Sequence, residues 1–268
     1  MLATLAIATA LSLTPAQDGK LELSNARTTF GFLGNIRENN KYLPGDVLFL
    51  AFDIKGMSVG KSGDIKYSLA LDMRNDAGVK VFGQLPQVIA SANSLGGTSL
   101  PGYAYADIGS KVAPGKYTLT VTVEDAMAKK SAKLDYQFEV LKKDFGIGRL
   151  GMWYDDRGQT WAPPVFVAGQ SVWIHFITMG FDRNAATKQP DVEVRMRVLD
   201  ESGKATLPQT VAGDTKTQKV QPEVEALPWF QKIELNRPGK FKIEVEAEDK
   251  VAKKTKKEIL SITVVEVK

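Results

Sequence analysis

Part of this sequence occurs twice, and that duplication constrains the fold more than any other feature. The tetrapeptide PGKY at residues 114–117 returns as PGKF at residues 238–241, an offset of 124 residues (238 minus 114). The same offset relates the Glu-Asp pairs at residues 124–125 and 248–249. A period held over such a span indicates a duplicated structural unit. The chain of 268 residues is therefore expected to contain two modules of similar size.

Apolar and polar residues alternate through most of the chain, which is typical of strands with one buried face. The clearest run is residues 65–73, and residues 117–123 and 241–247 follow the two Pro-Gly pairs with the same alternation. Glycine-containing turns at residues 75–78 and 201–203 are expected to close hairpins. Short strands, frequent turns and the lack of helical periodicity predict an all-β fold built from two sandwiches.

The first residues predict export. Residues 2–13 are apolar or small, and as a helix they would span about 18 Å, too short for a hydrocarbon core of about 30 Å. A small residue, Ala16, precedes a suitable cleavage point, so residues 1–16 are interpreted as a signal peptide, although no Lys or Arg precedes the apolar run. A buried N-terminal helix and a misassigned start codon are the alternatives. The signal peptide predicts a secreted or periplasmic protein without a transmembrane segment in the mature chain.

The predicted organisation is a signal peptide (1–16) followed by two tandem immunoglobulin-like β-sandwich domains (17–142 and 143–268). The junction near residues 141–144 contains no Gly/Ser run, so limited interdomain freedom is expected. The net charge is only +4 and is spread along the chain, so no nucleic-acid partner is expected. The absence of cysteine excludes disulfides, thiol nucleophiles and thiolate metal sites.

Residues 43–46 (LPGD) before an apolar strand, and residues 114–121 (PGKYTLTV) with an acidic residue at the strand end, carry a family resemblance. The pattern resembles the immunoglobulin-like or fibronectin-III-like repeats of uncharacterised secreted bacterial proteins, including many from planctomycetes. The resemblance covers essentially the whole mature chain. It implies spacers, adhesion units or binding domains, and the fold alone does not choose among these.

The residues that could support catalysis are few. The single histidine, His175, is expected mid-strand, pointing outward beside Trp173, so no Ser-His-acid triad and no enzymatic activity are predicted. The sequence GIGRLG at residues 146–151 matches a dinucleotide-binding fingerprint, but no helical sequence follows it. We interpret the match as chance. Its alignment with residues 30–34 (FGFLG) suggests a glycine-rich first strand or bulge.

The acidic pairs are expected to have a structural role. Because they recur at the same strand end, the aspartates are predicted to accept backbone N–H bonds in a turn. A calcium site between the modules is the alternative, since Ca²⁺ collects six to eight oxygen ligands from several loops. No cofactor or metal is otherwise expected.

Aromatic residues are the best functional candidates. Large aromatic side chains can form stacking platforms for sugars or dominate protein interfaces, or they can close a sandwich end or an interdomain seam. A second candidate surface is the outward, apolar face of two equivalent strands, which would be covered by the other module, a loop or a partner. The candidate ligand-binding residues are Trp153, Tyr154, Trp161 and Trp229, and the candidate interface residues are Phe49, Trp173 and Ile177.

Together these observations predict a secreted or periplasmic, non-enzymatic structural or interaction protein. It is expected to bind another macromolecule, either a protein or a cell-surface or extracellular polysaccharide, through its sandwich surfaces. The alternative is a pair of carbohydrate-binding modules that use the aromatic residues of the second domain.

Overall fold

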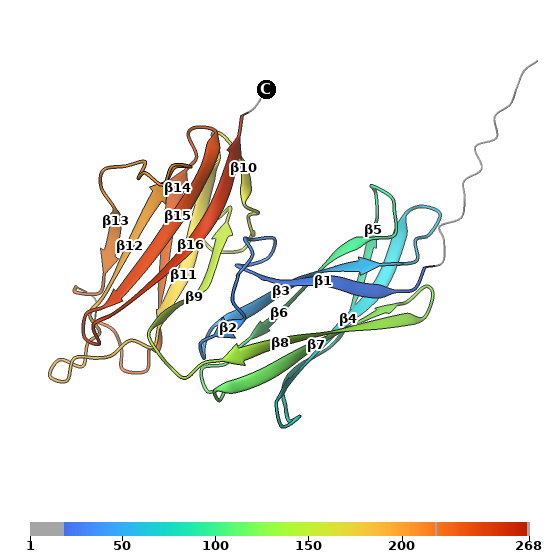
Figure 1. Cartoon of the computed structure of the whole chain (residues 1–268), viewed down its shortest axis with the longest axis horizontal. Coiled ribbons are helices and arrows are strands. Elements are labelled where there is room, and N and C mark those ends of the chain that lie inside the picture. The colour runs from blue at the N-terminus through green and yellow to red at the C-terminus, as the bar shows by residue number, and fades with distance from the viewer. Residues whose placement is uncertain (1–18, 218, 267–268) are drawn as a thin grey trace, which may run out of the picture.

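The structure is a computed structural model that describes residues 19–217 and 219–266. The predicted signal peptide, residues 1–16, lies outside the described residues. Within those residues the chain forms sixteen strands and no helix, arranged in four sheets. Two immunoglobulin-like sandwiches lie next to each other along the long axis (Figure 1). The predicted all-β fold is therefore confirmed.

The first sandwich contains a three-stranded sheet, β1-β3-β6, and a five-stranded sheet, β2-β8-β7-β4-β5. Neighbouring strands are antiparallel except β2 and β8, which are parallel. The strands are β1 (Glu22–Thr29), β2 (Lys41–Tyr42), β3 (Val47–Lys55), β4 (Asp64–Asn75), β5 (Lys80–Ala92), β6 (Leu100–Asp107), β7 (Gly115–Asp125) and β8 (Lys130–Val140).

The second sandwich repeats this topology strand for strand. Its sheets are β14-β11-β9 and β10-β16-β15-β12-β13, and β10 is parallel to β16. The strands are β9 (Gly146–Trp153), β10 (Val165–Val167), β11 (Ser171–Met179), β12 (Val192–Leu199), β13 (Val211–Asp214), β14 (Ala226–Glu234), β15 (Gly239–Asp249) and β16 (Lys254–Val265).

The 124-residue offset holds at both ends of three strand pairs, β1 and β9, β3 and β11, and β7 and β15. Between the equivalent strands β4 and β12, the offset is one residue longer. Leu71 pairs with Val121 in the first sandwich, and Met196 pairs with the equivalent Val245 in the second, an offset of 125 (196 minus 71). Because a one-residue slip would turn every side chain to the other face of the sheet, this shift keeps the apolar face of β12 toward the core.

Each sandwich has its own apolar core between its two sheets. The two cores contain equivalent, fully buried residues, for example Leu119 in β7 and Ile243 in β15. One side chain of the first half, Phe30, packs against the second core. β8 ends at Val140 and β9 begins at Gly146, and the domain boundary between residues 142 and 143 stays a prediction.

The acidic pairs have the predicted turn role. Asp125 accepts hydrogen bonds from the backbone N–H groups of Ser58, Met127 and Ala128. Asp249 accepts them from the equivalent donors of Asp182, Val251 and Ala252. Burial alone would raise the pKa of Asp125, but the backbone donors lower it below its ordinary value. These carboxylates therefore fasten equivalent turns in both sandwiches.

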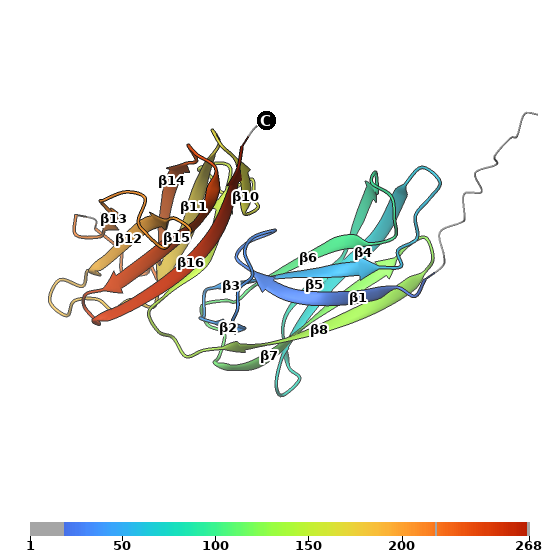
Figure 2. The same cartoon turned by 45° about the horizontal axis from the view of Figure 1, so that its top comes forward.

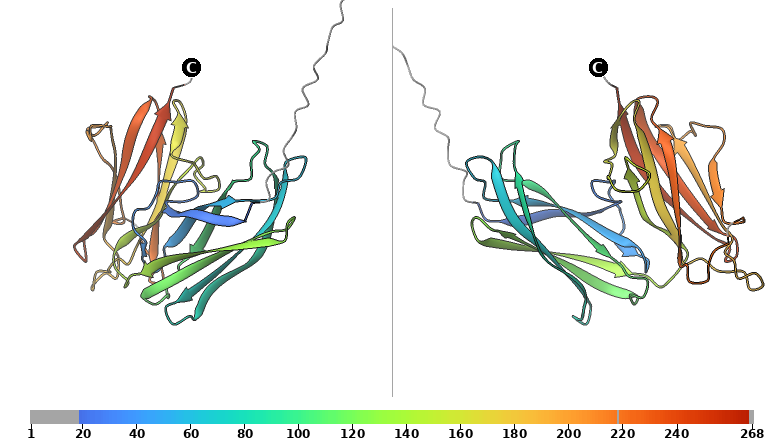
Figure 3. Two further views of the ribbon diagram at one scale, coloured as in Figure 1. Left: turned by 45° about the vertical axis from the view of Figure 1, so that its right-hand side comes forward. Right: turned by 180° about the vertical axis from the view of Figure 1, so that it is seen from behind.

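Two equivalent loops lie between the sandwiches. The loop after β1 reaches toward β16 and β10, and the loop after β9 extends toward the first sandwich (Figures 2 and 3). In the part of the chain that the structure describes, no helix has the length and apolar character needed to cross a membrane.

Candidate functional site

The loops after β1 and β9 form reciprocal contacts across the seam between the sandwiches. From the first loop, the Asn35 side-chain amide donates to the Ser261 carbonyl at 2.8 Å and its oxygen accepts from the Ser261 N–H at 3.0 Å. From the second loop, the Trp161 ring packs edge to face on Phe32 and Phe49, with ring centroids 5.6 and 5.0 Å apart. Each loop therefore reaches the other sandwich.

Two glycines make room for the Trp161 ring. A Cβ atom on Gly31, in the first sandwich, or on Gly151, in the second, would lie within 3.0 Å of that ring. Gly31 also has a φ of +77°, which L side chains rarely adopt. Trp153 stacks on the remaining side, with its ring centroid 4.2 Å from that of Trp161. Trp161 thus occupies a slot built jointly by both sandwiches.

A buried carboxylate provides the polar part of the seam. Asp46 is only 1% exposed and accepts hydrogen bonds from the Val47 N–H at 2.8 Å and the Arg149 N–H at 2.9 Å. The Arg37 guanidinium pairs with the second oxygen of Asp46 at 2.8 Å and lies over the Tyr42 ring, 4.1 Å from its centroid. Since a buried charge is costly without partners, these contacts make Asp46 an anchor for the second sandwich.

The side chain of Arg149 forms further contacts with the first sandwich at the protein surface. Its Nε donates to the Gly45 carbonyl at 3.1 Å, and its guanidinium pairs with Asp107 at 2.9 Å. Its backbone φ is +51°, at a β-bulge of β9, and the equivalent Asn25 of β1 has a φ of +53° at the same irregularity. The bulge turns the Arg149 N–H toward Asp46.

The glycine-rich motif has a packing role. Gly146, Gly148 and Gly151 pair with alternate residues of β11 and so share the outer face of the sheet. A Cβ atom on Gly146 would lie within 3.0 Å of Leu43, and one on Gly148 would come equally close to Met179. The glycines therefore leave a flat surface for the first sandwich. The alignment of this motif with residues 30–34 is wrong, because the structural counterpart of Gly146–Trp153 is Glu22–Thr29.

The structure separates the four aromatic residues proposed to bind a ligand. Trp153 is 6% exposed and lies with Trp161 in the seam, whereas Tyr154 is 40% exposed and faces Phe166 edge-on. Trp229 points to the inner side of its sheet, and its Nε1 donates to the Thr178 hydroxyl at 3.0 Å. The four rings do not form one flat platform.

The three residues proposed as an interface have different surroundings. Phe49 is buried under Phe32 and Trp161, so its cover is the neighbouring loop and the other module. Trp173 and Ile177 are half-buried on the outer face of β11. The Trp173 ring lies 6.1 Å from that of Phe230, which is 62% exposed and was missed by sequence reasoning. Alternation in β14 places Leu227 and Trp229 on the inner face of the sheet and Phe230 on the outer face. This alternation could have identified Phe230 as an exposed aromatic residue from the sequence.

His175 belongs to the same outer face, as the alternation predicts. Its ring lies 4.7 Å from Trp153 and 5.9 Å from Phe230, and its buried Nε2 has no hydrogen-bond partner among the described residues. Burial lowers the pKa of His175, while Asp155 and Asp156 oppose that shift, so the imidazole is neutral at neutral pH. We name Trp173, His175 and Phe230 the aromatic shelf.

A pocket of about 350 Å³ opens at the seam beside Trp161. Its aromatic walls come from both sandwiches, and the Arg149–Asp107 ion pair lies at its edge. The half-exposed Tyr105 ring faces Phe32 there, at a centroid distance of 5.6 Å. Within the described residues, no group of three or more His, Cys, Asp or Glu side chains is placed to hold a metal ion.

No family model matches the sequence, and no curated protein matches it. Solved structures do match. The C-terminal domain of the AgI/II polypeptide BspA of Streptococcus agalactiae is 8% identical, over 90% of this chain and 99% of that one, with a TM-score of 0.29. Escherichia coli alpha-2-macroglobulin is 10% identical over 91% of this chain and 22% of that one, with a TM-score of 0.32.

Red sea bream transglutaminase is 9% identical, over 92% of this chain and 31% of that one, with a TM-score of 0.28. The chain therefore spans less than a third of the length of the macroglobulin and the transglutaminase. Likenesses this low carry no conclusion about activity or partners. The fold assignment rests on the strand topology of the chain itself.

Proposed function

We propose that this chain is an exported, non-enzymatic interaction protein that presents two sandwiches in a fixed orientation to another macromolecule. The observation that carries the proposal is the aromatic shelf on the outer face of the second sandwich. Phe230 is 62% exposed there, in contact with Trp173 and His175. Exposed aromatic clusters supply large contact area at low conformational cost, and they are frequent binding hot spots. Export is supported by the signal-like residues 2–16.

Site-specific photocrosslinking in the native host tests this function. A photoreactive amino acid at position 230 is compared with one at Val79, which is 58% exposed in the β4–β5 turn and serves as the matched control. We expect one discrete adduct at position 230, lost when Trp173 is changed to Ser, and no discrete adduct at position 79. The same adducts at both positions, or none at position 230, would contradict a specific partner at the shelf.

Carbohydrate binding is a second candidate function, supported by the seam pocket. Its aromatic walls could stack on a sugar ring, and the paired Arg149 and Asp107 offer hydrogen bonds to adjacent hydroxyl groups. Variants of the buried tryptophans would disturb the seam itself, so the test uses Tyr105→Ala. Glycan-array binding by the native chain that Tyr105→Ala abolishes would support this function. No retention of the native chain on any glycan would remove it.

A further inference from the structure

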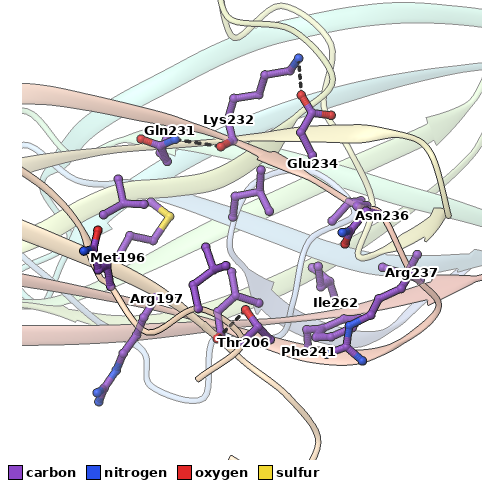
Figure 4. Close-up of a pocket in the computed structure, with 17 residues that line it drawn as sticks. Met196, Arg197, Thr206, Gln231, Lys232, Glu234, Asn236, Arg237, Phe241 and Ile262 are labelled. Atoms are coloured by element: carbon purple, nitrogen blue, oxygen red, sulfur yellow. Dashed lines mark hydrogen bonds and ion pairs between the residues drawn. The ribbon is translucent and has the colours of Figure 1, made fainter. Parts of the chain in front are cut away.

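The second sandwich contains an apolar pocket of about 340 Å³ that opens between its two sheets (Figure 4). β12 contributes Met196 and Val198, and β15 and β16 contribute Phe241 and Ile262. The pocket lies on the side where β13 and β14 form the sheet edges, away from the seam with the first sandwich. Its size lies within the usual range for small-ligand sites.

A difference between the two sandwiches explains why the pocket is there. In the first, the equivalent edge strand β5 has 13 residues, and its Phe82 and Ile89 pack against the core. In the second, β13 has only four residues, and the preceding loop leaves Leu207 62% exposed at the pocket. The short strand therefore leaves the inner faces of the sheets accessible from the side.

One cation at the pocket is available to a ligand. Arg197 is paired with Glu244, and Lys232 extends to Glu234 at 2.6 Å (Figure 4). Arg237 is exposed and rests on the pocket residue Phe241, 4.9 Å from its ring centroid. In the described part of the chain, Arg237 forms no ion pair with a carboxylate.

Asp200 is a carboxylate that interacts electrostatically with Arg237 without forming an ion pair with it. The Ser202 hydroxyl is the main cause of its lowered pKa, and Arg237 adds to the effect. Asp200 is already satisfied by hydrogen bonds from Ser202 and the Lys204 N–H. The Arg237 guanidinium therefore keeps donors for an anion at the pocket.

We propose that this pocket binds a medium-chain fatty acid, with the alkyl chain between the sheets and the carboxylate at Arg237. At about 30 Å³ for each water-sized group, the pocket holds roughly ten methylene-sized groups. The apolar walls favour an alkyl chain over a polar ligand, and guanidinium groups match carboxylates in geometry and charge. The binding needs no partner chain and is independent of the aromatic shelf.

Calorimetric titration of the full mature chain with hexanoate, octanoate and decanoate tests the proposal. The dissociation constant should fall about fourfold for each added methylene until the pocket is filled. Arg237→Gln should weaken decanoate binding about three- to tenfold and leave decanol binding unchanged. Arg157→Gln, on the exposed loop after β9, is the matched control and should change neither.

A second measurement does not depend on a variant. In the native chain, decanoate should shift the methyl resonances of Ile262 and Val264, which line the pocket, and leave those of the first core unchanged. The proposal is overturned if decanoate shows no saturable binding, if affinity does not depend on chain length, if Arg237→Gln has no effect, or if the shifted methyl groups lie elsewhere.

Discussion

The two sandwiches share one strand order but differ at their edges and loops. Their central strands β7 and β15 are the same length and bury equivalent residues, whereas the edge strands β5 and β13 have 13 and four residues. The core ladder is thus the invariant part of the duplicated unit. The differences lie in the edge strands, the loops and the outer sheet faces, and those places form the seam, the aromatic shelf and the opening of the pocket.

One pair of equivalent positions illustrates this difference between the two sandwiches. Position 46 carries Asp46, buried and bonded to the second sandwich through the Arg149 N–H. The side chain of its counterpart, Gln170, is exposed and accepts a hydrogen bond from the nearby Val167 N–H. The same place in the fold is therefore an interdomain anchor in one copy and a local turn bond in the other.

The largest expected effect on the free energy of unfolding comes from replacing Asp46, compared with the same replacement of Gln170. Asp46→Ala should lower the free energy of unfolding by about 3–5 kcal/mol, because it leaves Arg37 buried without its carboxylate. Gln170→Ala should cost only about 0.5–1.5 kcal/mol, the net value of one hydrogen bond. Urea unfolding of both variants measures the difference. Equal losses would contradict the assignment of Asp46 as the anchor.

Filling the Trp161 slot should have the next largest effect. Gly151→Ala places a Cβ within 3.0 Å of the Trp161 and Trp153 rings and should destabilise the chain by about 1–3 kcal/mol through overpacking. Gly109→Ala meets only an ordinary contact with Val112 and is the matched control. Thermal unfolding compares them, and tryptophan emission should shift to the red in Gly151→Ala alone. If Gly151→Ala did not change the free energy of unfolding, the slot would not be closely packed around the Trp161 ring, and this account would be contradicted.

The smallest effect is a pH dependence from the seam. Burial raises the pKa of Glu258 above its ordinary 4.5, and Arg37 only partly opposes this shift. The folded chain therefore prefers protonated Glu258, and this contribution to stability is lost as the pH rises through the raised pKa.

Glu258→Gln should consequently be more stable than the native chain at pH 7 and equally stable near pH 4. Urea unfolding across this range measures the change, with Glu223→Gln on an exposed loop as the control. A gain that persists undiminished at pH 4 would mean that the effect does not come from titration of Glu258.

The local structure could be predicted from sequence, because period-two alternation and Pro-Gly starts depend on neighbouring residues alone. The turn role of Asp125 and Asp249 followed from their repeated position for the same reason. The sequence offered the seam only as one of several alternatives for the aromatic residues and for the outer face of β3, and it did not indicate which residues meet there. The contact of Trp161 with Phe49 joins residues far apart in the chain, and it depends on the conformations of two loops that show no periodicity.

The misalignment of the glycine motif has a related cause. Glycines carry no apolar alternation, so Gly146, Gly148 and Gly151 gave no register, and residues 30–34 matched them only by composition. The space that these glycines leave becomes meaningful only once Leu43 and Trp161 are seen to fill it. Packing between the two modules is therefore harder to predict from a single sequence than the strands and turns within each module.

A distance measurement between the sandwiches tests most directly whether they are held at a fixed angle. The chain has no cysteine, so Val88→Cys in β5 and Val211→Cys in β13 would carry two spin labels at unique, exposed positions. Double electron–electron resonance should give one narrow distance distribution, and adding Trp161→Ala and Asp46→Ala should broaden it. A broad distribution in the chain with the seam intact would contradict a fixed arrangement.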